Sequence, residues 1–390
     1  MPLLNRAIEM QDEVSGWRRH LHENPEIMFD VHETAQFVAE KLREFGCDEV
    51  QTGIGRTGVV GIVRGRHGEG PTVGLRSDMD ALPLTETTGK PWASRKDGKM
   101  HACGHDGHTA MLLGAAQYLA ETRNFRGSIA VIFQPAEEGG GGGREMVKDG
   151  MMERFSISEV YGMHNIPGLP IGQFAIRKGP IMAATDEFTI TVEGRGGHAA
   201  QPHRTLDPIV IGAQLVNALQ TIVSRGTDPL DSVVLSVTKF HAGDAHNIIP
   251  QRAELAGTVR TLRPEMRDFA EKRLIEIAEG VAGALGASAT VHYARNYPVT
   301  FNHARETDFA AKTARNVAGN GAVNEEVAPM MAGEDFSYML EARPGAFIFI
   351  GNGESASLHN PSYDFNDDAI PHGISYWVQL AESALAPPSS

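Results

Sequence analysis

The segment from His101 to His108 concentrates side chains that bind metals. Cys103 and His105 stand two residues apart, and a thiolate and an imidazole at this spacing bind one cation or bridge two. Gly104 between them permits a tight backbone conformation. A Cys-x-His pair also arises by chance in proteins that bind no metal, so this segment indicates a metal site only if further ligands join it.

Two adjacent carboxylates, Glu137 and Glu138, are followed by an unbroken glycine run, Gly139–Gly143. Adjacent acidic groups repel each other, and a glycine run loses much conformational entropy on ordering, so stability alone does not explain this segment. A functional interpretation divides the work: one carboxylate binds a metal, and the other accepts a proton from a metal-bound water. A solvated acidic loop is the alternative interpretation.

Two separate histidines, His164 and His359, each follow a strand-like stretch. Each one alone is more readily an ordinary histidine than a ligand. The set is more informative, because cysteine, glutamate and histidine ligands all fall in one predicted domain, after predicted strands or in the loops beyond them. Five ligands and a second glutamate would hold two divalent ions with room for a bridging hydroxide.

The elements that must position these residues alternate between strands and helices in the first half of the chain. Helices are predicted over 32–45 and 109–119, and strands over 59–63, 72–75 and 128–133. This alternation predicts an α/β fold with a mixed, mostly parallel sheet and helices on both faces. Ligands bind such sheets at the carboxyl ends of the strands, where the polar residues after Leu75 and Phe133 would lie.

Near residue 184 the pattern changes to strands in which polar and apolar residues alternate. The predicted order is a strand at 187–193, a helix at 207–224, strands at 232–240 and 253–260, a helix at 264–285 and a strand at 289–293. This β-α-β-β-α-β order is a split βαβ arrangement, as in ferredoxin-like folds. After about residue 297 the first pattern returns. We therefore expect a catalytic domain of residues 1–184 and 297–390, interrupted by a small domain of residues 185–296.

The composition narrows the classes of partner. The 390 residues are 41% hydrophobic and 22% charged, with a formal net charge of −14, which disfavours nucleic acid as a partner. The chain has 2 cysteines, too few for a disulfide framework, and shows no basic-then-apolar leader. No apolar run approaches the roughly 18 to 20 residues that span a bilayer, so we expect no membrane association and a cytoplasmic location.

Several ordered blocks resemble the M20 metallopeptidase family, and within it the amidohydrolase branch that includes hippurate hydrolases, N-acyl-amino-acid amidohydrolases and plant auxin-conjugate hydrolases. The blocks cover nearly the whole chain: residues 18–26, 75–83, 100–108, 133–139, 194–198, 247–250, 333–336 and 358–360. The resemblance implies a larger zinc-exopeptidase-like domain and a smaller domain that serves as a lid and a dimerisation domain.

The resemblance also implies a role for each matched residue. The metal ligands would be Cys103, His105, Glu138, His164 and His359, with cysteine standing where other branches use a carboxylate. Glu137 would be the general base, and His198 would reach into the active site of the partner subunit to steady the oxyanion. Asn247 and Arg260 would hold the free carboxylate of the substrate, although an arginine on an alternating strand is by default solvent-facing.

Five other residues receive supporting interpretations. Asp80 would orient the ligands or their loop, and His108, like His101, would support the site or pack against it. Asp335, with its neighbour Glu334, precedes a helix-like stretch, where helix-start electrostatics explains both carboxylates. A substrate-side role for this pair stays open.

The function that the resemblance implies is hydrolysis of the amide bond of N-acyl or N-aroyl amino acids such as hippurate. It would depend on two divalent ions, manganese or zinc first and cobalt or nickel as further options. A dipeptidase or exopeptidase of the same superfamily is one alternative, and a non-catalytic metal-binding or ligand-binding protein is another. A homodimer formed through the small domain follows from the role of His198.

Overall fold

The computed structural model describes residues 3–387, and its contacts divide the chain into two compact units. The first unit comprises residues 3–181, 301–328 and 335–387, and the second comprises residues 182–300 and 329–334. The short segment 329–334 was expected in the larger domain. It groups with the second unit because the Ala183 N–H donates to the carbonyl oxygens of Met330 and Ala332, at 3.0 and 2.9 Å.

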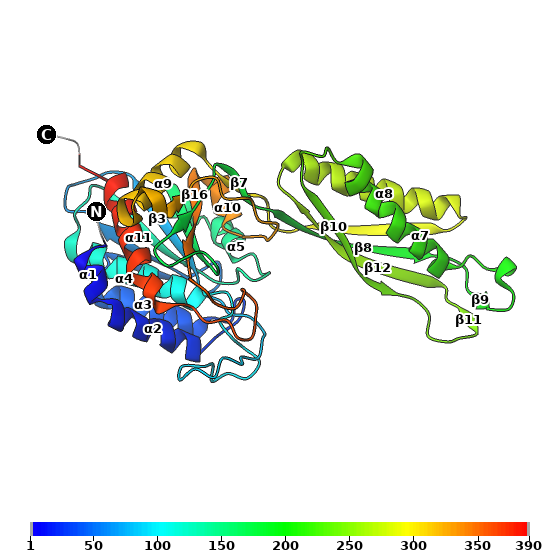
Figure 1. The fold of residues 1–390 in the computed structure, drawn as a ribbon, viewed down its shortest axis with the longest axis horizontal. Coiled ribbons are helices and arrows are strands. Elements are labelled where there is room, and N and C mark those ends of the chain that lie inside the picture. Colours follow the sequence, from blue (N-terminus) through cyan, green and yellow to red (C-terminus); the bar gives the residue numbers. More distant parts are fainter. Residues whose placement is uncertain (1–2, 388–390) are drawn as a thin grey trace. The chain divides into compact units, whose positions relative to one another are not determined.

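The first unit is built on a mixed sheet with strand order β1-β2-β4-β3-β5-β16-β6-β15 (Figure 1). Its strands are β1 (Glu49–Ile54), β2 (Gly58–Arg64), β3 (Thr72–Asp78), β4 (Ser128–Gln134), β5 (Ile157–Ile166), β6 (Phe174–Ala175), β15 (Val323–Asn324) and β16 (Gly345–Gly351). The central neighbours β4, β3, β5 and β16 run parallel, whereas β1 and β2 are antiparallel. The predicted mixed, mostly parallel sheet is confirmed.

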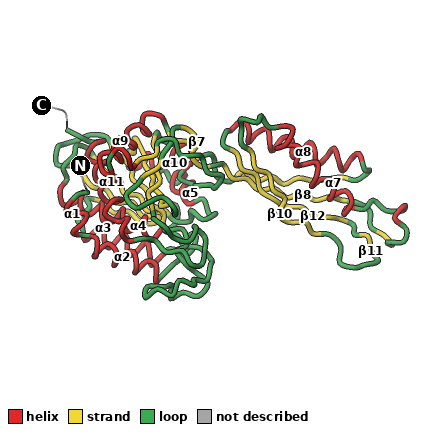
Figure 2. Tube along the Cα trace, in the orientation of Figure 1, coloured by secondary structure: helices red, strands yellow, loops and turns green. Residues whose placement is uncertain are grey.

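Helices cover both faces of this sheet (Figure 2). They are α1 (Asn5–Glu9), α2 (Gln11–Glu23), α3 (His32–Glu44), α4 (His105–Thr122), α5 (Gly142–Lys148), α6 (Met151–Arg154), α9 (Ala304–Ala318), α10 (Ser337–Ala342) and α11 (Ile370–Ala384). Successive residues of a strand point to opposite faces. Val73 and Leu75 of β3 join the main core with α2, α3, α4, α9 and α11, and Arg76 points to the other face, near Phe336 before α10.

The second unit has the chain order β8-α7-β10-β12-α8-β13 and the sheet order β10-β12-β8-β13. Its elements are β8 (Ala184–Glu193), α7 (Pro208–Thr221), β10 (Val233–His241), β12 (Arg252–Thr261), α8 (Pro264–Ala284) and β13 (Ser288–Arg295). All three strand pairings are antiparallel, and both helices pack on one face through a shared apolar core. The inserted ferredoxin-like arrangement is confirmed.

Short strands complete the two units. The strands β9 (Gly197–His198) and β11 (Ile248–Ile249) pair with each other, as do β7 (Gly179–Met182) and β14 (Thr300–Asn302). Among residues 3–387, no helix combines the length and the apolar character needed to cross a membrane.

Candidate active site

The carboxyl ends of the parallel strands bring the predicted chemistry to one edge of the large sheet. Asp78 at the end of β3 is in register with Gln134 at the end of β4, and Phe349 of β16 is in register with His164 of β5. His164 therefore lies inside its strand, whereas the sequence placed it after one. Helix α4 begins at the same edge, because the Thr109 hydroxyl donates to the Asp78 carbonyl oxygen at 2.8 Å.

Cys103 and His105 flank Gly104 at the beginning of α4. Gly104 has a φ of 89°, and a Cβ built on it would lie 2.3 Å from the side-chain oxygen of Asn165, so only glycine fits there. The Cys103 Sγ lies 3.4 Å from His164 Nε2. The tight turn thus places the thiol beside a histidine of β5.

Hydrogen bonds fix which ring nitrogen each buried histidine presents. His105 Nδ1 donates to the Asp80 carbonyl oxygen at 2.7 Å, and His164 Nδ1 donates to the Asn165 carbonyl oxygen at 2.6 Å. In both rings Nε2 is therefore the nitrogen left to face a cation. Orientation of ligating imidazoles by such partners is a regular feature of metal sites.

The Glu138 carboxylate lies between His105 and His359. Its Oε1 lies 3.9 Å from His105 Nε2 and 3.2 Å from His359 Nε2, the latter without hydrogen-bond geometry. The five predicted ligands and Glu137 form three overlapping groups whose ligand atoms lie within 4.8 Å of one another: Cys103 with His105 and His164, Cys103 with Glu138 and His359, and His105 with Glu137 and Glu138. The structure thus brings together all five predicted ligands and Glu137.

The donor atoms fit divalent cations. His105 Nε2 and Glu138 Oε1 are buried and have no hydrogen-bond partner among residues 3–387, which is costly unless another group binds them. Sulfur, imidazole nitrogen and carboxylate oxygen together suit zinc and also accept manganese, cobalt or nickel. The residues present therefore match the metal centre that the sequence predicts.

The charges in the site respond to burial and to one another. Burial, followed by the negative charges of Glu138 and Glu137, raises the pKa of the Cys103 thiol well above its usual value. Burial alone would lower the pKa of His105, but the carboxylates of Asp78, Asp80 and Glu138 outweigh it and raise that pKa to about 10. Both groups hold protons at neutral pH, so cation binding must displace them.

Burial and the nearby charge of His108 lower the pKa of His164, so this ring is neutral and ready to bind a cation. Burial would raise the pKa of Glu138, but contacts with His359 and the positive charge of His105 lower it. The His359 ring has a raised pKa because of its contact with Glu138. The carboxylate is therefore ionised beside two imidazoles.

Asp80 holds the loop that carries the two glutamates. Its Oδ1 accepts from the Glu137 N–H at 2.9 Å, and its Oδ2 accepts from the Glu138 N–H at 3.1 Å. Ala136, just before them, has a φ of 53°, a backbone conformation that needs such support. The sequence assigned Asp80 an orienting role, and its contacts with this loop are of that kind.

Sequence reasoning missed Asp78 and Arg76 as parts of this region. Asp78, His105 and His108 are close enough to suggest another cation site. However, Asp78 accepts from Arg76 and from His108 Nδ1, at 2.8 and 2.7 Å, and His108 Nε2 lies 2.7 Å from the side-chain oxygen of Asn165. Because these atoms already have partners, we assign the group a scaffolding role. The only sequence signal was the polar run at the end of β3.

The Asp335 carboxylate, which the sequence placed before a helix-like stretch, contacts segments far from α10 in the sequence. Its carboxylate accepts from Arg76 Nη2 at 3.0 Å, from Gln134 Nε2 at 2.6 Å and from the Gly143 N–H at 2.8 Å. The carboxylate is buried and faces the strand and the glycine loop, because these supply its three donors. Helix-start electrostatics does not account for these three contacts.

The remaining predicted residues lie in the second unit. His198 pairs with Ile248, and the Ala199 N–H donates to the Asn247 carbonyl oxygen at 3.0 Å, so His198 and Asn247 are neighbours, both exposed. Arg260 lies toward the far end of β12: the strand from Arg252 to Arg260 spans roughly 27 Å at about 3.4 Å per residue. The structure therefore does not bring Arg260 to His198 and Asn247 within this unit.

Arg260 is half-buried and donates to the Val259 carbonyl oxygen at 3.1 Å, and no carboxylate pairs with it among residues 3–387. Burial lowers its pKa, an effect that the charge of Asp186 opposes. A half-buried guanidinium without a carboxylate partner is suited to binding a carboxylate ligand.

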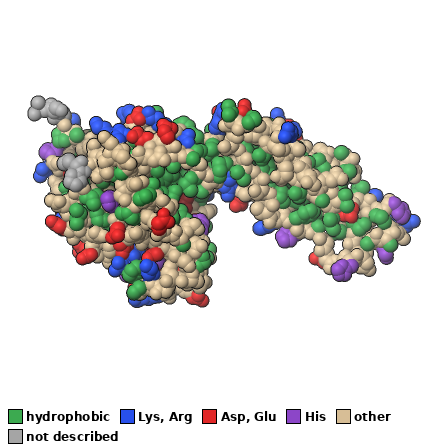
Figure 3. Space-filling view, viewed as in Figure 1, with side chains coloured by type: hydrophobic (Ala, Val, Ile, Leu, Met, Phe, Trp, Pro, Cys, Tyr) green, Lys and Arg blue, Asp and Glu red, His purple; other side chains and the backbone are tan. Residues whose placement is uncertain are grey.

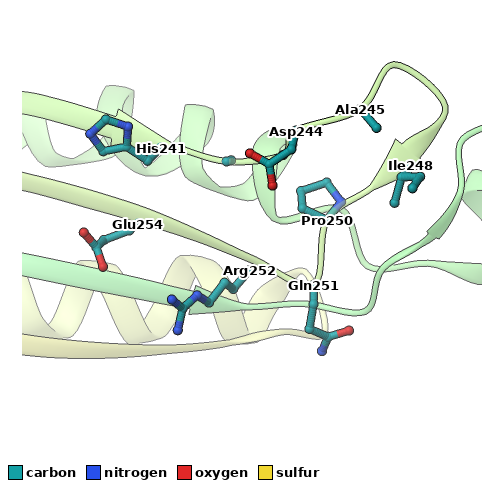
Figure 4. Close-up of a pocket in the computed structure, with 10 residues that line it drawn as sticks. His241, Asp244, Ala245, Ile248, Pro250, Gln251, Arg252 and Glu254 are labelled. Atoms are coloured by element: carbon teal, nitrogen blue, oxygen red, sulfur yellow. The ribbon is translucent and has the colours of Figure 1, made fainter.

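A hollow of about 670 Å³ lies beside the loop that contains Asn247 (Figure 4). Its walls include His241 and Asp244 on one side and Arg252 and Glu254 on the other. None of the five predicted ligands lines this hollow. It borders the predicted substrate-binding loop and forms no part of the metal cluster.

The chain is similar to three curated proteins over almost the full length of both sequences. The chain is 43% identical to a hippurate hydrolase of Campylobacter jejuni, covering 98% of this chain and 99% of that protein. It is 40% identical to an N-acetyl-L-cysteine deacetylase of Bacillus subtilis, covering 96% and 89%. It is 42% identical to the thermostable carboxypeptidase 2 of Saccharolobus solfataricus, covering 98% and 97%.

A solved structure is similar over the same extent. The YXEP protein of Bacillus subtilis, described as a dinuclear metal-binding peptidase of the M20 family, matches with a TM-score of 0.85 and 33% identity, covering 97% of this chain and 99% of that one. Residues 74–383 match the peptidase family M20/M25/M40. The resemblance inferred from the sequence blocks is confirmed, and the chain belongs to the M20/M25/M40 peptidase family.

Proposed function

We propose that this protein is a dinuclear metal-dependent amidohydrolase that cleaves N-acyl or N-aroyl amino acids into a carboxylate and a free amino acid. The observation that carries this proposal is the convergence of Cys103, His105, Glu138, His164 and His359 beside Glu137. The similar hippurate hydrolase and N-acetyl-L-cysteine deacetylase act on substrates of this class by name, which supports the choice.

In this proposal the five converging side chains hold two divalent ions, manganese or zinc. Bound ions of this kind lower the pKa of a water and polarise the amide carbonyl. Two imidazoles already present their Nε2 atoms, and the buried Glu138 Oε1 has no hydrogen-bond partner among residues 3–387. The protein thus offers a preformed set of donors.

Glu137 is the proposed general base. Its carboxylate takes a proton from the attacking water and delivers it to the leaving nitrogen, so that an amide and a water become a carboxylate and an amine. The Asp80 bond to its N–H and the Asp335 N–H, 3.4 Å from its Oε1, hold this side chain in the buried site. A protein that only stored metal would not need a second carboxylate placed in this way.

The second unit supports a homodimeric arrangement. Strand β10 is an edge of its sheet, and it exposes Val234 and Phe240, while α7 exposes Ile209 and Val210. Figure 3 shows hydrophobic side chains gathered on the visible face of this unit. Unpaired edges and apolar patches of this kind favour association. We propose that two copies pair here.

Such a dimer also accounts for the spread of the substrate-binding residues. In our proposal His198 and Asn247 act in the active site of the other subunit, whereas Arg260 acts in its own subunit. The long separation along β12 fits this division, because one chain's sheet places these groups near opposite ends of that strand. His198 would stabilise the oxyanion, and Arg260 would hold the substrate carboxylate.

Glu137→Gln tests the proposal, with Glu40→Gln on the exposed side of α3 as the matched control. We expect Glu137→Gln to keep the metal content of the wild type and to lose nearly all turnover of N-benzoylglycine. The control should retain both. Wild-type turnover by Glu137→Gln would contradict the assigned mechanism.

A peptidase activity is the second candidate, because the chain is 42% identical to a carboxypeptidase over nearly its whole length. A panel of acetyl, benzoyl and indole-acetyl amino acids assayed beside dipeptides distinguishes the two by kcat/KM. The proposal requires the acyl amino acids to be the better substrates. Turnover of the dipeptides alone would show that the protein is a peptidase and contradict the proposed amidohydrolase function.

A further inference from the structure

The loop that carries Glu137 and Glu138 is rich in glycine. It runs from Gln134, the last residue of β4, to Gly143 in the first turn of α5. Glycine residues in the loop allow it to fold back on itself: a Cβ on Gly142 would lie 1.7 Å from the Pro135 carbonyl oxygen. Glycine has the largest backbone freedom, so the same sequence that permits this shape does not enforce it.

One carboxylate binds both ends of this loop. Asp335 accepts from the Gln134 side chain at 2.6 Å at the beginning of the loop and from the Gly143 N–H at 2.8 Å at its end. The backbone N–H of Asp335 faces Glu137 Oε1 at 3.4 Å. A single residue, distant in sequence, therefore contacts the beginning, the middle and the end of the catalytic loop.

A buried arginine fixes this carboxylate in turn. Arg76 is fully buried on β3 and donates to Asp335 at 3.0 Å, to Gln134 Oε1 at 2.9 Å and to Asp78 at 2.8 Å. Hydrogen bonds of an ionised carboxylate to a guanidinium are about twice as strong as neutral ones. The arginine also joins Asp335 to Asp78, which accepts a hydrogen bond from His108 Nδ1 at 2.7 Å.

We propose that Asp335, held by Arg76, is a positioning residue that sets the placement of the Glu137 carboxylate by fixing both ends of the loop from Gln134 to Gly143. This inference rests on the proposed role of Glu137 as general base. Asp335 itself does not touch the reacting atoms, and it acts through the loop.

The closing experiment compares Asp335→Asn with Asp97→Asn, an exposed carboxylate of the same unit that undergoes the same charge change. The asparagine cannot accept from Arg76, Gln134 and Gly143 together. We expect kcat for N-benzoylglycine to fall about 100-fold, the loss typical of a catalytic group displaced by about 1 Å, with KM changed little. The control should keep both constants.

Hydrogen exchange supplies a readout that does not depend on turnover. In Asp335→Asn the amides of the loop and of the first turn of α5 should exchange about tenfold faster, while those of β4 keep their protection. A merely structural role would instead lower protection throughout the unit. Wild-type kcat with unchanged loop protection would overturn the proposal.

A second variant covers the case in which Asp335→Asn does not fold. Gln134→Met removes the hydrogen bond from Arg76 to Gln134 and the one from Gln134 to Asp335. It leaves the charges of Arg76, Asp78 and Asp335 paired. Faster amide exchange in the loop together with a lowered kcat supports the positioning role of Asp335. Unchanged loop exchange and unchanged kcat overturn it. If the wild-type protein cleaves no N-acyl amino acid, the proposed function fails, and the exchange data still decide whether Asp335 orders the loop.

Discussion

His22 offers a quantitative test of the electrostatics behind the active site. Its side chain is fully buried on α2, with Nδ1 2.7 Å from Asp106 and Nε2 3.4 Å from Glu86. Asp106 directly follows the predicted ligand His105 in sequence. Replacing His22 with glutamine removes the titrating group and keeps a polar side chain at this position.

The magnitude follows from the pKa of His22. Burial alone would lower this pKa, but the carboxylates of Asp106 and Glu86 outweigh it and raise the pKa from the ordinary 6.5 to about 9. The protonated ring therefore stabilises the folded state by about 3 kcal/mol, since each tenfold gain in proton affinity is worth about 1.4 kcal/mol. This contribution is complete below pH 6.5 and is lost as the pH rises to about 9.

The assay is denaturant unfolding of the wild type and His22→Gln at a series of pH values. Their difference in the free energy of unfolding should shrink by about 1.4 kcal/mol per pH unit between pH 6.5 and 9, because other titrations cancel between the two proteins. A His22→Gln difference that does not change with pH would refute the reasoning.

Three further predictions concern the site and the assembly. Binding of zinc to metal-free protein should release protons and tighten as the pH rises from 6 to 8, because Cys103 and His105 hold protons until the cation displaces them. Calorimetry in buffers of different ionisation enthalpy measures the number of protons released, and zinc binding that does not depend on pH would contradict the prediction. Asp80→Asn leaves one loop N–H without its acceptor, so the free energy of unfolding should fall by about 1–3 kcal/mol and kcat about 100-fold; a wild-type kcat would argue against the orienting role. Phe240→Glu should convert dimers into monomers in sedimentation experiments, and an unchanged dimer would place the interface away from β10.

Residue type and spacing were sufficient to predict which side chains converge. Cysteine, histidine and paired glutamates are uncommon enough together that their positions after predicted strands pointed to one sheet edge, and Cys103, His105, Glu138, His164 and His359 do meet there. The strand alternation likewise predicted both sheets, because burial on two faces and burial on one face leave different patterns.

The supporting shell was not predictable in the same way. Arg76 and Asp335 are 259 residues apart, and no local pattern indicates that they form an ion pair. Arg76 interrupts an apolar strand, a position that only the fold explains. Asp335 precedes a short helix, and its local context suggested a role at that helix, whereas its donors come from distant segments.

The most direct test of the central claim is anomalous diffraction from crystals of the protein with its native metal, measured at the absorption edge of that metal. We predict two anomalous peaks per chain. The two ions should be shared among the ligands Cys103, His105, Glu138, His164 and His359, and Glu137 should lie beside the ions without binding either one. A single peak, or peaks held by Asp78 and His108 in place of these five side chains, would contradict the account.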